Sequence, residues 1–514
     1  MTHQETRVDL LVVGGGVNGA AIARDAIGRG LSVLLCEKDD IAAHTSSAST
    51  KLIHGGLRYL EHQEFALVAK SLAERKRLLD TAPHIIWPQG FILPHQSHLR
   101  PAWMIRAGLF LYDRLGGWPD RRLPGSRAVD LRAHPSGVPL RDSLVRGFQY
   151  SDACVLDTRL AVLNALDAAE RGATVLTHTA CIAARRDQAH WHADLRSDDG
   201  VMHSVTARAL VNATGPWATR FLDGPAQLPH SHQVRLVKGS HVLVPALFGH
   251  EYAYIFQQPD RRFVFAIPYD GDFTLIGTTD VEFHGDPADV RVDDDEVAYL
   301  CEAASRYFKQ AVLPQAVVWR YSGVRPLVED RSARASEITR DYVLPFDGSA
   351  APILTVLGGK ITTSRRLAEE AVNTLSRALG VTRPAWTGGA PLPGGDLPGR
   401  DFHAFAADFA RRHAWLPAPL ALRLCRHYGT RASRILRDAT TVTDLGEHFG
   451  AGLYAAEVDY LVDVEWARHA DDILWRRTRL GLRMDASGQQ RLRDHLQDRQ
   501  PVRHARVTRA PHVL

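Results

Sequence analysis

Short apolar runs alternate with glycine-rich turns at the start of the chain. Residues 10–13 form a compact apolar run, which predicts a buried strand, and the glycines at 14–16 end it. Small and apolar residues at 17–26 favour a helix packed on a sheet, and residues 31–35 form the next apolar run. The order of these segments predicts a strand–helix–strand unit at the N-terminus.

The apolar period then changes from one segment to the next. Between residues 234 and 283 it is repeatedly β-like, which predicts an antiparallel sheet distinct from the first, parallel one. The apolar segment 104–115 is interpreted as a core helix, with insertion into a membrane as the alternative. Other expected helices are 65–79, 363–379, 404–411, 420–427, 454–466 and 473–480, and other expected strands are 174–176, 210–212 and 353–357.

These patterns predict an α/β fold in several parts. A dinucleotide-binding domain built from dispersed segments spans residues 1–385. An antiparallel-sheet substrate domain is interleaved with it, mainly over 75–145 and 218–335. Residues 386–400 are rich in proline and glycine and predict a linker, and residues 401–514 predict a C-terminal helical domain with a basic tail.

Composition excludes several classes of protein. With 514 residues, 45% of them hydrophobic and 23% charged, the chain is neither disordered nor a small disulfide scaffold. The net charge of +4 is too slight to indicate nucleic acid. The five cysteines form no C-x-x-C pair, so we expect neither a disulfide framework nor a metal site. We also expect no secretory signal and no transmembrane helix.

The first glycine turn has the spacing Gly14-x-Gly16-x-x-Gly19 between the predicted strand and helix. Such glycines let the backbone approach a pyrophosphate, which the N-terminus of the helix then stabilises. Glu37 follows the second strand, where a carboxylate binds ribose hydroxyls and disfavours NADP. FAD and NAD remain, and a fingerprint at the N-terminus with sheet strands far downstream is the layout of FAD enzymes.

Two later segments carry groups that suit a flavin. Residues 45–51 supply hydroxyls and backbone N–H groups, although a Ser/Thr-rich surface loop has the same composition. Gly358 and Gly359 precede a helix and permit close approach to a flat ring, whose reduced form the helix N-terminus would stabilise. The Asn212–Gly215 turn resembles a second flavoprotein turn.

Long motifs extend this interpretation over nearly the whole chain. They are Val13–Ala20, Thr45–Leu60, Tyr321–Pro326, Thr339–Tyr342, Gly358–Thr363 and Asp471–Thr478. In these motifs the chain resembles the FAD-dependent, aerobic respiratory glycerol-3-phosphate dehydrogenases. It departs from the family pattern at Ala21, usually glycine, and at Ser364, usually tyrosine, so no contact of that tyrosine is carried over.

The resemblance implies FAD-dependent oxidation of sn-glycerol 3-phosphate to dihydroxyacetone phosphate, by hydride transfer from C2 to flavin N5. Electrons would pass to a membrane quinone, and the protein would be cytoplasmic, attached peripherally to the anionic inner face of the cell membrane. A homodimer is a candidate assembly. The motif positions imply cofactor contacts from Gly14, Gly16, Asn18, Gly19, Glu37, Thr45, Ser46, Ser47, Ser49, Lys51, His54, Gly55, Gly215, Gly358, Gly359, Lys360 and Thr362.

A phosphorylated substrate requires cations that persist at neutral pH, and the arginine fork suits phosphate. The expected substrate-binding residues are Arg58, Tyr59, Arg325, Arg340 and Lys360. Oxidation of an alcohol also requires a base. We expect His241 in that role with Arg325 as its electrostatic partner, whereas His54 is the alternative base or positions the flavin loop.

Three other functions stay open on these residues. An oxidase would use oxygen in place of quinone, and an amine or amino-acid oxidase would use arginine to bind a carboxylate. A flavin-binding protein without turnover is a remote alternative. The tail from Arg476 onward holds ten arginines and three aspartates, which favours an anionic lipid surface. It lacks the interleaved aromatic residues of a nucleic-acid binder.

Overall fold

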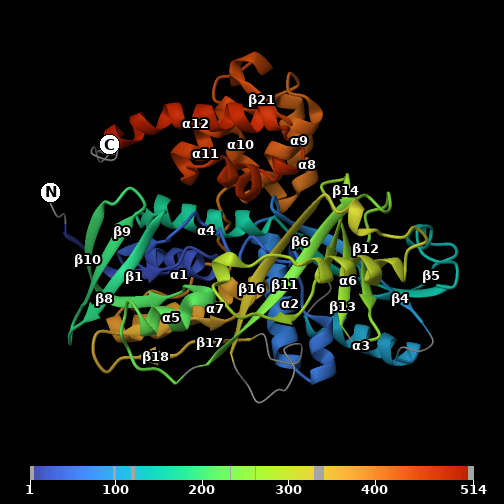
Figure 1. Cartoon of the computed structure of the whole chain (residues 1–514), viewed down its shortest axis with the longest axis horizontal. Coiled ribbons are helices and arrows are strands. Elements are labelled where there is room, and N and C mark those ends of the chain that lie inside the picture. The colour runs from blue at the N-terminus through green and yellow to red at the C-terminus, as the bar shows by residue number, and fades with distance from the viewer. Residues whose placement is uncertain are drawn as a thin grey trace. The chain divides into compact units, whose positions relative to one another are not determined.

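The computed structural model describes residues 5–96, 100–116, 122–231, 233–260, 262–328 and 341–506. It divides into two compact units, Met1–Leu392 and Pro393–Leu514, and the division falls within the stretch rich in proline and glycine. Figure 1 shows two sheets in the first unit, with β1, β8, β9 and β10 at one end and β4, β6 and β11–β14 at the other.

The first sheet confirms the predicted strand–helix–strand unit. Strand β1 (Glu5–Val13) is parallel to β2 (Val33–Cys36) and β10 (Met202–Asn212), and helix α1 (Val17–Gly28) connects the first two. The strand order is β18-β19-β10-β1-β2-β7. The remaining members are β7 (Thr174–Leu176), β8 (Thr179–Arg186), β9 (Trp191–Ser197), β18 (Phe346–Asp347) and β19 (Ile353–Thr355).

Helix α1 is buried along most of its length because helices pack beside it. It contacts α4 (Asp157–Glu170) and α7 (Ser364–Leu379), so its residues are small or apolar on most sides. Ala21 is buried on this helix, and its methyl group is accommodated where the family usually has glycine. The other departure, Ser364, donates a hydrogen bond to the Ile361 carbonyl at the start of α7. A short helix, α5 (Ala218–Asp223), follows β10.

The second sheet has ten strands, and its strands come from residues 52–155 and 234–328. Apart from the parallel pair of β4 and β12, its described pairs are antiparallel, as predicted. Helix α6 (Asp294–Ser305) packs its apolar side on this sheet in one core cluster. The strands are β3 (Leu52–Ile53), β4 (Ile86–His95), β5 (Arg127–Asp130), β6 (Arg146–Val155), β11 (Val234–Pro245), β12 (Ala253–Gln257), β13 (Phe263–Tyr269), β14 (Phe273–Gly277), β15 (Val281–Glu282) and β16 (Trp319–Val328).

Two small features join the sheets to the turns around them. Strand β17 (Tyr342–Val343) pairs with β20 (Leu357–Gly358) just before α7 begins. Helix α2 (Phe65–Thr81) follows the short 3₁₀ helix Leu57–His62. Strand β20 contacts β16 of the second sheet, and α2 contacts the helical turn Ile361–Thr363 that precedes α7.

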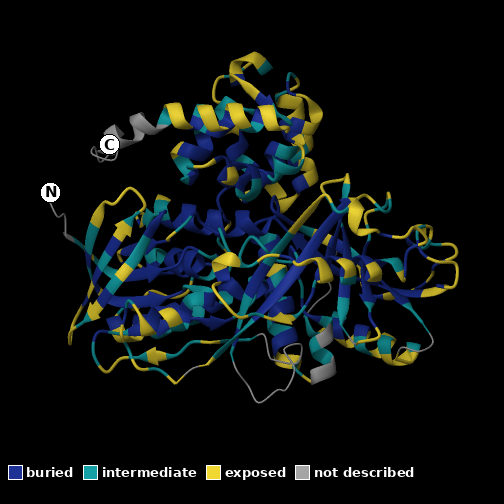
Figure 2. Cartoon of the chain, viewed as in Figure 1, coloured by how far each residue is buried: buried dark blue, intermediate teal, exposed yellow. Residues whose placement is uncertain are grey.

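Helix α3 (Ala102–Leu115) overturns the interpretation of segment 104–115 as a core helix. Only Leu109 and Tyr112 are buried on it, whereas Trp103 is 70% exposed and Phe110 is 52% exposed. Figure 2 shows most of α3 as exposed or intermediate. Helix α3 therefore exposes large apolar side chains to solvent instead of burying them in a core.

The second unit is helical, as predicted. Its helices are α8 (Phe402–Arg412), α9 (Ala418–Tyr428), α10 (Ala432–Leu436), α11 (Ala455–Glu465) and α12 (Ala486–Arg506), with a hairpin of β21 (His448–Gly450) and β22 (Leu453–Tyr454). Residues 472–477 form a π-helical turn in place of the expected longer helix. Its own core includes Phe409, Phe449 and, on α12, Leu492. No helix in the described ranges is long and apolar enough to cross a bilayer.

Candidate active site

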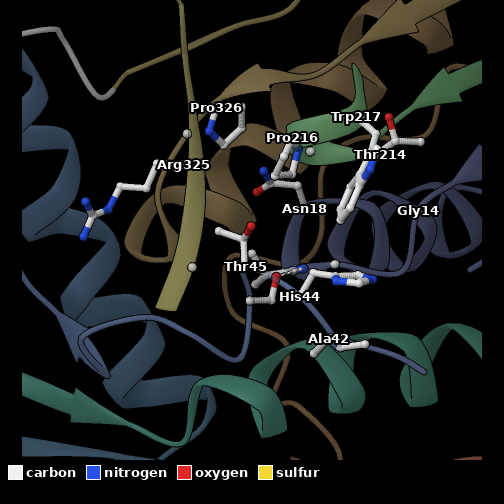
Figure 3. A pocket seen from close by; sticks show the side chains of 18 of the residues that line it. Gly14, Asn18, Ala42, His44, Thr45, Thr214, Pro216, Trp217, Arg325 and Pro326 are labelled. Carbon is white, nitrogen blue, oxygen red and sulfur yellow. Dashed lines mark hydrogen bonds between the residues drawn. The ribbon is translucent and has the colours of Figure 1, made fainter. Parts of the chain in front are cut away.

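A cavity of about 430 Å³ lies at the carboxyl ends of β1, β2 and β10. Residues of β16, in the second sheet, also line it. Its lining comes from six segments of the first unit: 13–18, 36–59, 179–181, 213–225, 323–327 and 358–361. In Figure 3, Gly14, Asn18, His44, Thr45 and Trp217 lie on one side of β16. Arg325 extends from β16 on the opposite side in this view. The cavity therefore reaches from the carboxyl edge of the first sheet to the second sheet.

The predicted glycine fingerprint forms one wall. Gly14 has a φ of +111°, and a Cβ there would lie 2.4 Å from the Ala213 carbonyl oxygen. A Cβ on Gly19 would lie 1.9 Å from the Gly14 carbonyl oxygen. Only glycine at this position therefore lets the helix lie so close to the turn after β1. The Val17 N–H donates to Ser46 Oγ at 2.9 Å, so the 45–51 loop covers the N-terminus of α1. This is the geometry of an anion-binding turn.

Glu37 lies at the end of β2 and faces the cavity, as predicted. Its carboxylate accepts hydrogen bonds from the Gly15 N–H at 2.7 Å and the Asp39 N–H at 3.0 Å. Burial raises the pKa of Glu37, and these two backbone bonds oppose the shift. The carboxylate is thus held rigidly beside the glycine turn, where ribose hydroxyls would bind.

An aromatic and basic cluster closes this end of the cavity, and the sequence analysis did not include it. The Lys38 ammonium lies 4.7 Å from the centre of the Trp217 ring, and the His44 ring meets the same tryptophan edge-on at 4.7 Å. Trp217 follows the predicted Asn212–Gly215 turn, and Gly215 itself lines the cavity. Cys181 and Thr179 also line it. Only the return of β8 beside β2 brings them there, so no local motif signals them.

The 45–51 loop divides into lining and supporting residues. Thr45, Ser46 and Ser49 line the cavity as predicted, together with Ala48 and Thr50. Ser47 and Lys51 are not among the lining residues. The Lys51 ammonium instead pairs with buried Asp157 at 2.8 Å, and the Ser47 hydroxyl donates to the His44 carbonyl at 2.8 Å. Both therefore hold the shape of the loop from behind.

Three further predicted cofactor residues also lie behind the lining. Gly19 packs against the glycine turn, as described above. The Gly55 N–H donates to the Tyr112 hydroxyl at 2.8 Å, and the Thr362 hydroxyl exchanges hydrogen bonds with the backbone of His54. His54 itself lines the cavity. A motif alone does not separate residues that contact a ligand from residues that shape the loop around it.

The second glycine turn faces the cavity from the opposite wall. Gly358 and Gly359 have φ values of +75° and +92°, and both line the cavity with Lys360. A Cβ on Gly359 would lie 3.5 Å from Asn18 Nδ2, so the two glycine turns approach one another across the site. Asn18 Oδ1 is buried and has no hydrogen-bond partner among the described residues. An orphaned acceptor between two glycine turns fits a bound dinucleotide with donor groups.

A cationic end lies around Arg325 on β16. Its guanidinium donates to the Asp280 carboxylate at 2.7 Å and to the Thr278 hydroxyl at 2.9 Å. A Cβ on Gly239 of β11 would lie 2.2 Å from this guanidinium, so only glycine leaves room for it. Lys360 lies 5.0 Å from the Tyr59 ring centre, and both line the cavity as predicted. Arg340 and the side chain of Arg58 lie outside the described part of the chain.

His241 on β11 is fully buried and is not among the cavity-lining residues. Its Nε2 lies 3.0 Å from Thr50 Oγ1, and its ring stacks on Tyr321 with centres 4.9 Å apart. Burial lowers the pKa of His241 well below its usual range, and the cations Arg325 and Lys51 lower it further. The imidazole is therefore neutral near pH 7 and reaches the cavity only through Thr50. The expected base thus lies behind the cavity wall, whereas the alternative, His54, lies on it.

Comparison with known proteins agrees with this geometry. Residues 9–365 match the family of FAD dependent oxidoreductases, and residues 385–496 match the C-terminal domain of alpha-glycerophosphate oxidase. A glycerol-3-phosphate dehydrogenase of Pseudomonas aeruginosa is 53% identical and covers 96% of both chains. The aerobic glycerol-3-phosphate dehydrogenase of Escherichia coli is 49% identical over 94% of this chain and 96% of its own. A D-erythritol 1-phosphate dehydrogenase of Brucella abortus is 48% identical over 93% of this chain and 95% of its own.

Among solved structures, the glycerol-3-phosphate dehydrogenase of Bacillus halodurans in complex with FAD has a TM-score of 0.75. It is 26% identical and covers 96% of this chain and 94% of its own. The oxidoreductase domain, this FAD complex and the two glycine turns agree on FAD as the cofactor. The chain therefore belongs to the FAD-dependent glycerol-3-phosphate dehydrogenase family.

Proposed function

We propose that this enzyme oxidises sn-glycerol 3-phosphate to dihydroxyacetone phosphate. The observation that carries the proposal is that two cations line the cavity together with Tyr59. They are Arg325, which is held in a fixed orientation, and Lys360. When bound, FAD supplies the hydride acceptor at its N5 atom, so the substrate must place its C2 carbon against the flavin. The two glycine turns and the 45–51 loop hold the cofactor for that contact.

Arg325 and Lys360 suit the substrate phosphate. Asp280 and Thr278 fix the arginine fork before substrate arrives, so less conformational freedom is lost on binding. Arg58 and Arg340 are proposed as further phosphate ligands from the family motifs. The charge of the phosphate thus anchors one end of a three-carbon substrate and leaves the C2 hydroxyl towards the 45–51 loop.

Removal of the C2 hydroxyl proton is assigned to His241, with Arg325 as its electrostatic partner. The cation of Arg325 stabilises the alkoxide-like oxygen that develops as the proton leaves. His54 remains the alternative base, because it lines the cavity directly. His54 lies in the family motif Thr45–Leu60, whereas His241 lies outside the family motifs. The substitutions described below distinguish the two candidate bases.

The test is an anaerobic visible spectrum of the purified holoenzyme before and after sn-glycerol 3-phosphate is added. Bleaching of the flavin absorbance supports the proposal, and an unchanged spectrum contradicts it. D-Erythritol 1-phosphate is the matched comparison, since a relative at 48% identity carries that name. The higher kcat/KM of the two identifies the substrate. Amino acids and amines provide the negative comparison.

The electron acceptor is proposed to be a membrane quinone, reached by peripheral attachment to an anionic bilayer. Helix α3 supports this attachment, because Trp103, Met104, Phe110 and Leu111 are exposed on it. The basic tail is less suited than its net charge suggested. Arg476 and Arg477 pair with Asp472 and Glu465, and Arg499 pairs with Asp463, all within the second unit. Hydrogen peroxide formation in air, in place of quinone reduction, would identify an oxidase.

A further inference from the structure

The structure leaves a gap between the expected base and the substrate. His241 is fully buried and absent from the cavity lining, so its imidazole cannot take a proton from a substrate without an intermediary. Thr50 lies between them. It lines the cavity, and its hydroxyl is 3.0 Å from His241 Nε2. We propose that the Thr50 hydroxyl is a catalytic proton relay between the substrate C2 hydroxyl and His241, an inference that rests on the proposed function.

The relay balances as a pair of proton transfers. The substrate O–H bond breaks and its proton passes to Thr50 Oγ1, while the Thr50 proton passes to His241 Nε2. The electron pair of the substrate C2–H bond leaves as hydride to the oxidised flavin, and C2–O becomes a carbonyl. Thr50 is unchanged at the end, so the hydroxyl needs only to keep its position between the two partners.

The surroundings of His241 favour such a position. Tyr321 of β16 stacks on one face of the ring, and a Cβ on Gly277 of β14 would lie 2.1 Å from its Cδ2 atom. The imidazole is therefore packed between β16 and the end of β14. Its Nδ1 atom has no hydrogen-bond partner among the residues that the structure describes. Nε2 therefore faces the Thr50 hydroxyl. When that hydroxyl donates to Nε2, the proton of the neutral imidazole is on Nδ1.

The loop that presents Thr50 is held from both sides. The Ser49 hydroxyl donates to Asp157 at 2.7 Å, and the Tyr321 hydroxyl donates to the Ser49 carbonyl at 2.9 Å. Lys51 pairs with the same Asp157 and lies 5.0 Å from the centre of the Tyr321 ring. Thr50 is thus flanked by two anchored residues, which suits a relay because proton transfer requires a fixed donor–acceptor distance.

The charged groups around the imidazole also suit a transient proton. The cations facing His241 are Lys51 and Arg325, and each is paired with an aspartate, Asp157 and Asp280 respectively. Burial, and after it these two cations, lower the pKa of His241 and keep the imidazole neutral at rest, so Nε2 can accept a proton. They also make the protonated ring short-lived, so the transfer is coupled to departure of the hydride.

The decisive variants are Thr50→Val and Thr50→Ser. Valine keeps the shape and removes the hydroxyl, whereas serine keeps the hydroxyl. We expect stopped-flow reduction of the flavin by sn-glycerol 3-phosphate to slow roughly 100-fold in Thr50→Val and to recover in Thr50→Ser. FAD content should match the wild type in both. Equal rates in Thr50→Val and wild type would overturn the relay, whereas a wild-type enzyme that is not reduced would overturn the proposed function instead.

A double variant tests whether Thr50 acts through His241. If the two form one path, Thr50→Val combined with His241→Gln should be no slower than His241→Gln alone. If the rate losses of the two single variants multiply in the double variant, Thr50 and His241 do not act on one path. An undiminished rate in His241→Gln together with a loss in His54→Gln would assign the base to His54 and reject the relay.

A readout independent of turnover distinguishes a relay from a merely structural threonine. Deuterium exchange at the imidazole C2 position, followed by mass spectrometry, reports the pKa of His241 in the protein without substrate. If Thr50→Val keeps the loop closed, the pKa of His241 should stay low or fall, because the imidazolium loses a hydrogen-bond acceptor. A rise towards the ordinary value would show that the loop has opened to water and would reject a relay role.

Discussion

At the scale of single residues, the site depends on charges and hydroxyls that are held in place by a second layer of side chains. Asp280 and Thr278 orient Arg325, Asp157 orients Lys51 and Ser49, and Thr362 holds the backbone of His54. These supporting groups lie on other segments of the chain than the residues they hold. A substitution in this second layer should therefore affect catalysis without contact to the substrate.

Replacement of Arg325 by alanine should weaken recognition of the phosphate. Loss of a charged, bidentate donor costs about 2–4 kcal/mol, so kcat/KM should fall roughly 30- to 1,000-fold. KM should rise because the phosphate loses a ligand, and kcat should fall because the developing alkoxide loses its cationic partner. Arg320→Ala is the matched control, because Arg320 is on the same strand and pairs with exposed Asp294. Steady-state kinetics with sn-glycerol 3-phosphate check this. Unchanged kinetics in Arg325→Ala would remove the residue from the site.

His241 should also contribute to the pH dependence of stability. The unfolded chain protonates this imidazole near pH ~6.5, whereas the folded chain keeps it neutral because its pKa is lowered by burial. The unfolded state thus binds more protons below that pH, and stability is lost as the pH falls. Melting temperatures measured between about pH 7.5 and 5.5 should decline more steeply for the wild type than for His241→Gln.

His190→Gln provides the control for that comparison, because His190 is exposed in the turn after β8. Its melting temperatures should follow those of the wild type at each pH. A slope in His241→Gln that equals the wild-type slope would mean that the imidazole titrates alike in both states, contrary to its burial.

At the scale of elements, helix α3 shows why hydrophobicity alone does not decide burial. The segment has enough apolar residues for a core helix, yet its inner face consists of Leu109 and Tyr112 only. Tyr112 reaches the site, since its hydroxyl accepts from the Gly55 N–H and donates to buried Asp152. One helix thus presents an apolar face to solvent and, through its opposite face, supports the loop of His54 and Tyr59.

Trp103→Ser combined with Phe110→Ser should reduce binding to anionic vesicles at least tenfold, because about 1.5–3 kcal/mol is lost for each large apolar group that no longer leaves water. Flotation with vesicles of mixed phosphatidylcholine and phosphatidylserine measures this. The melting temperature should stay unchanged, since both side chains are exposed. Val138→Ser, which alters another exposed apolar residue, is the control. Undiminished binding of the double variant would assign the membrane contact elsewhere.

At the scale of the whole molecule, the two units have separate cores. The cavity and both glycine turns belong to the first unit, whereas the second has a helical core around Phe409 and Phe449. Helix α12 contributes Leu492 and Leu496 to that second core. The C-terminal segment is therefore structural up to these residues and not only a basic tail.

A fragment of residues 393–514 should fold by itself, because it has a buried core large enough for an independent domain. Ending the same fragment after Gly481 should abolish cooperative melting, since Leu492 and Leu496 are lost from the core. Circular dichroism during heating distinguishes the two. A shortened fragment that still melts cooperatively would show that α12 is dispensable for the core.

The sequence by itself determined the nucleotide-binding half of the site. The glycine fingerprint, Glu37 and the second glycine turn follow from local spacing, because a strand, a tight turn and a helix N-terminus bring their own residues together. The antiparallel strands between residues 234 and 283 and the separate helical C-terminal unit were likewise predictable from apolar period and composition. The departures at Ala21 and Ser364 required no change in this part of the fold.

Only the tertiary structure decided which residues complete the site. Thr50 and His241 meet across 191 residues because β11 pairs with β16 at Tyr321 and the 45–51 loop packs on that strand. The same pairing brings Arg325 over Gly239 and distinguishes it from the many surface arginines. The exposure of α3 depends on which of its side chains other segments bury, and these are only Leu109 and Tyr112. These features depend on strand register and on packing between distant segments, which hydrophobic periodicity along a single chain does not specify.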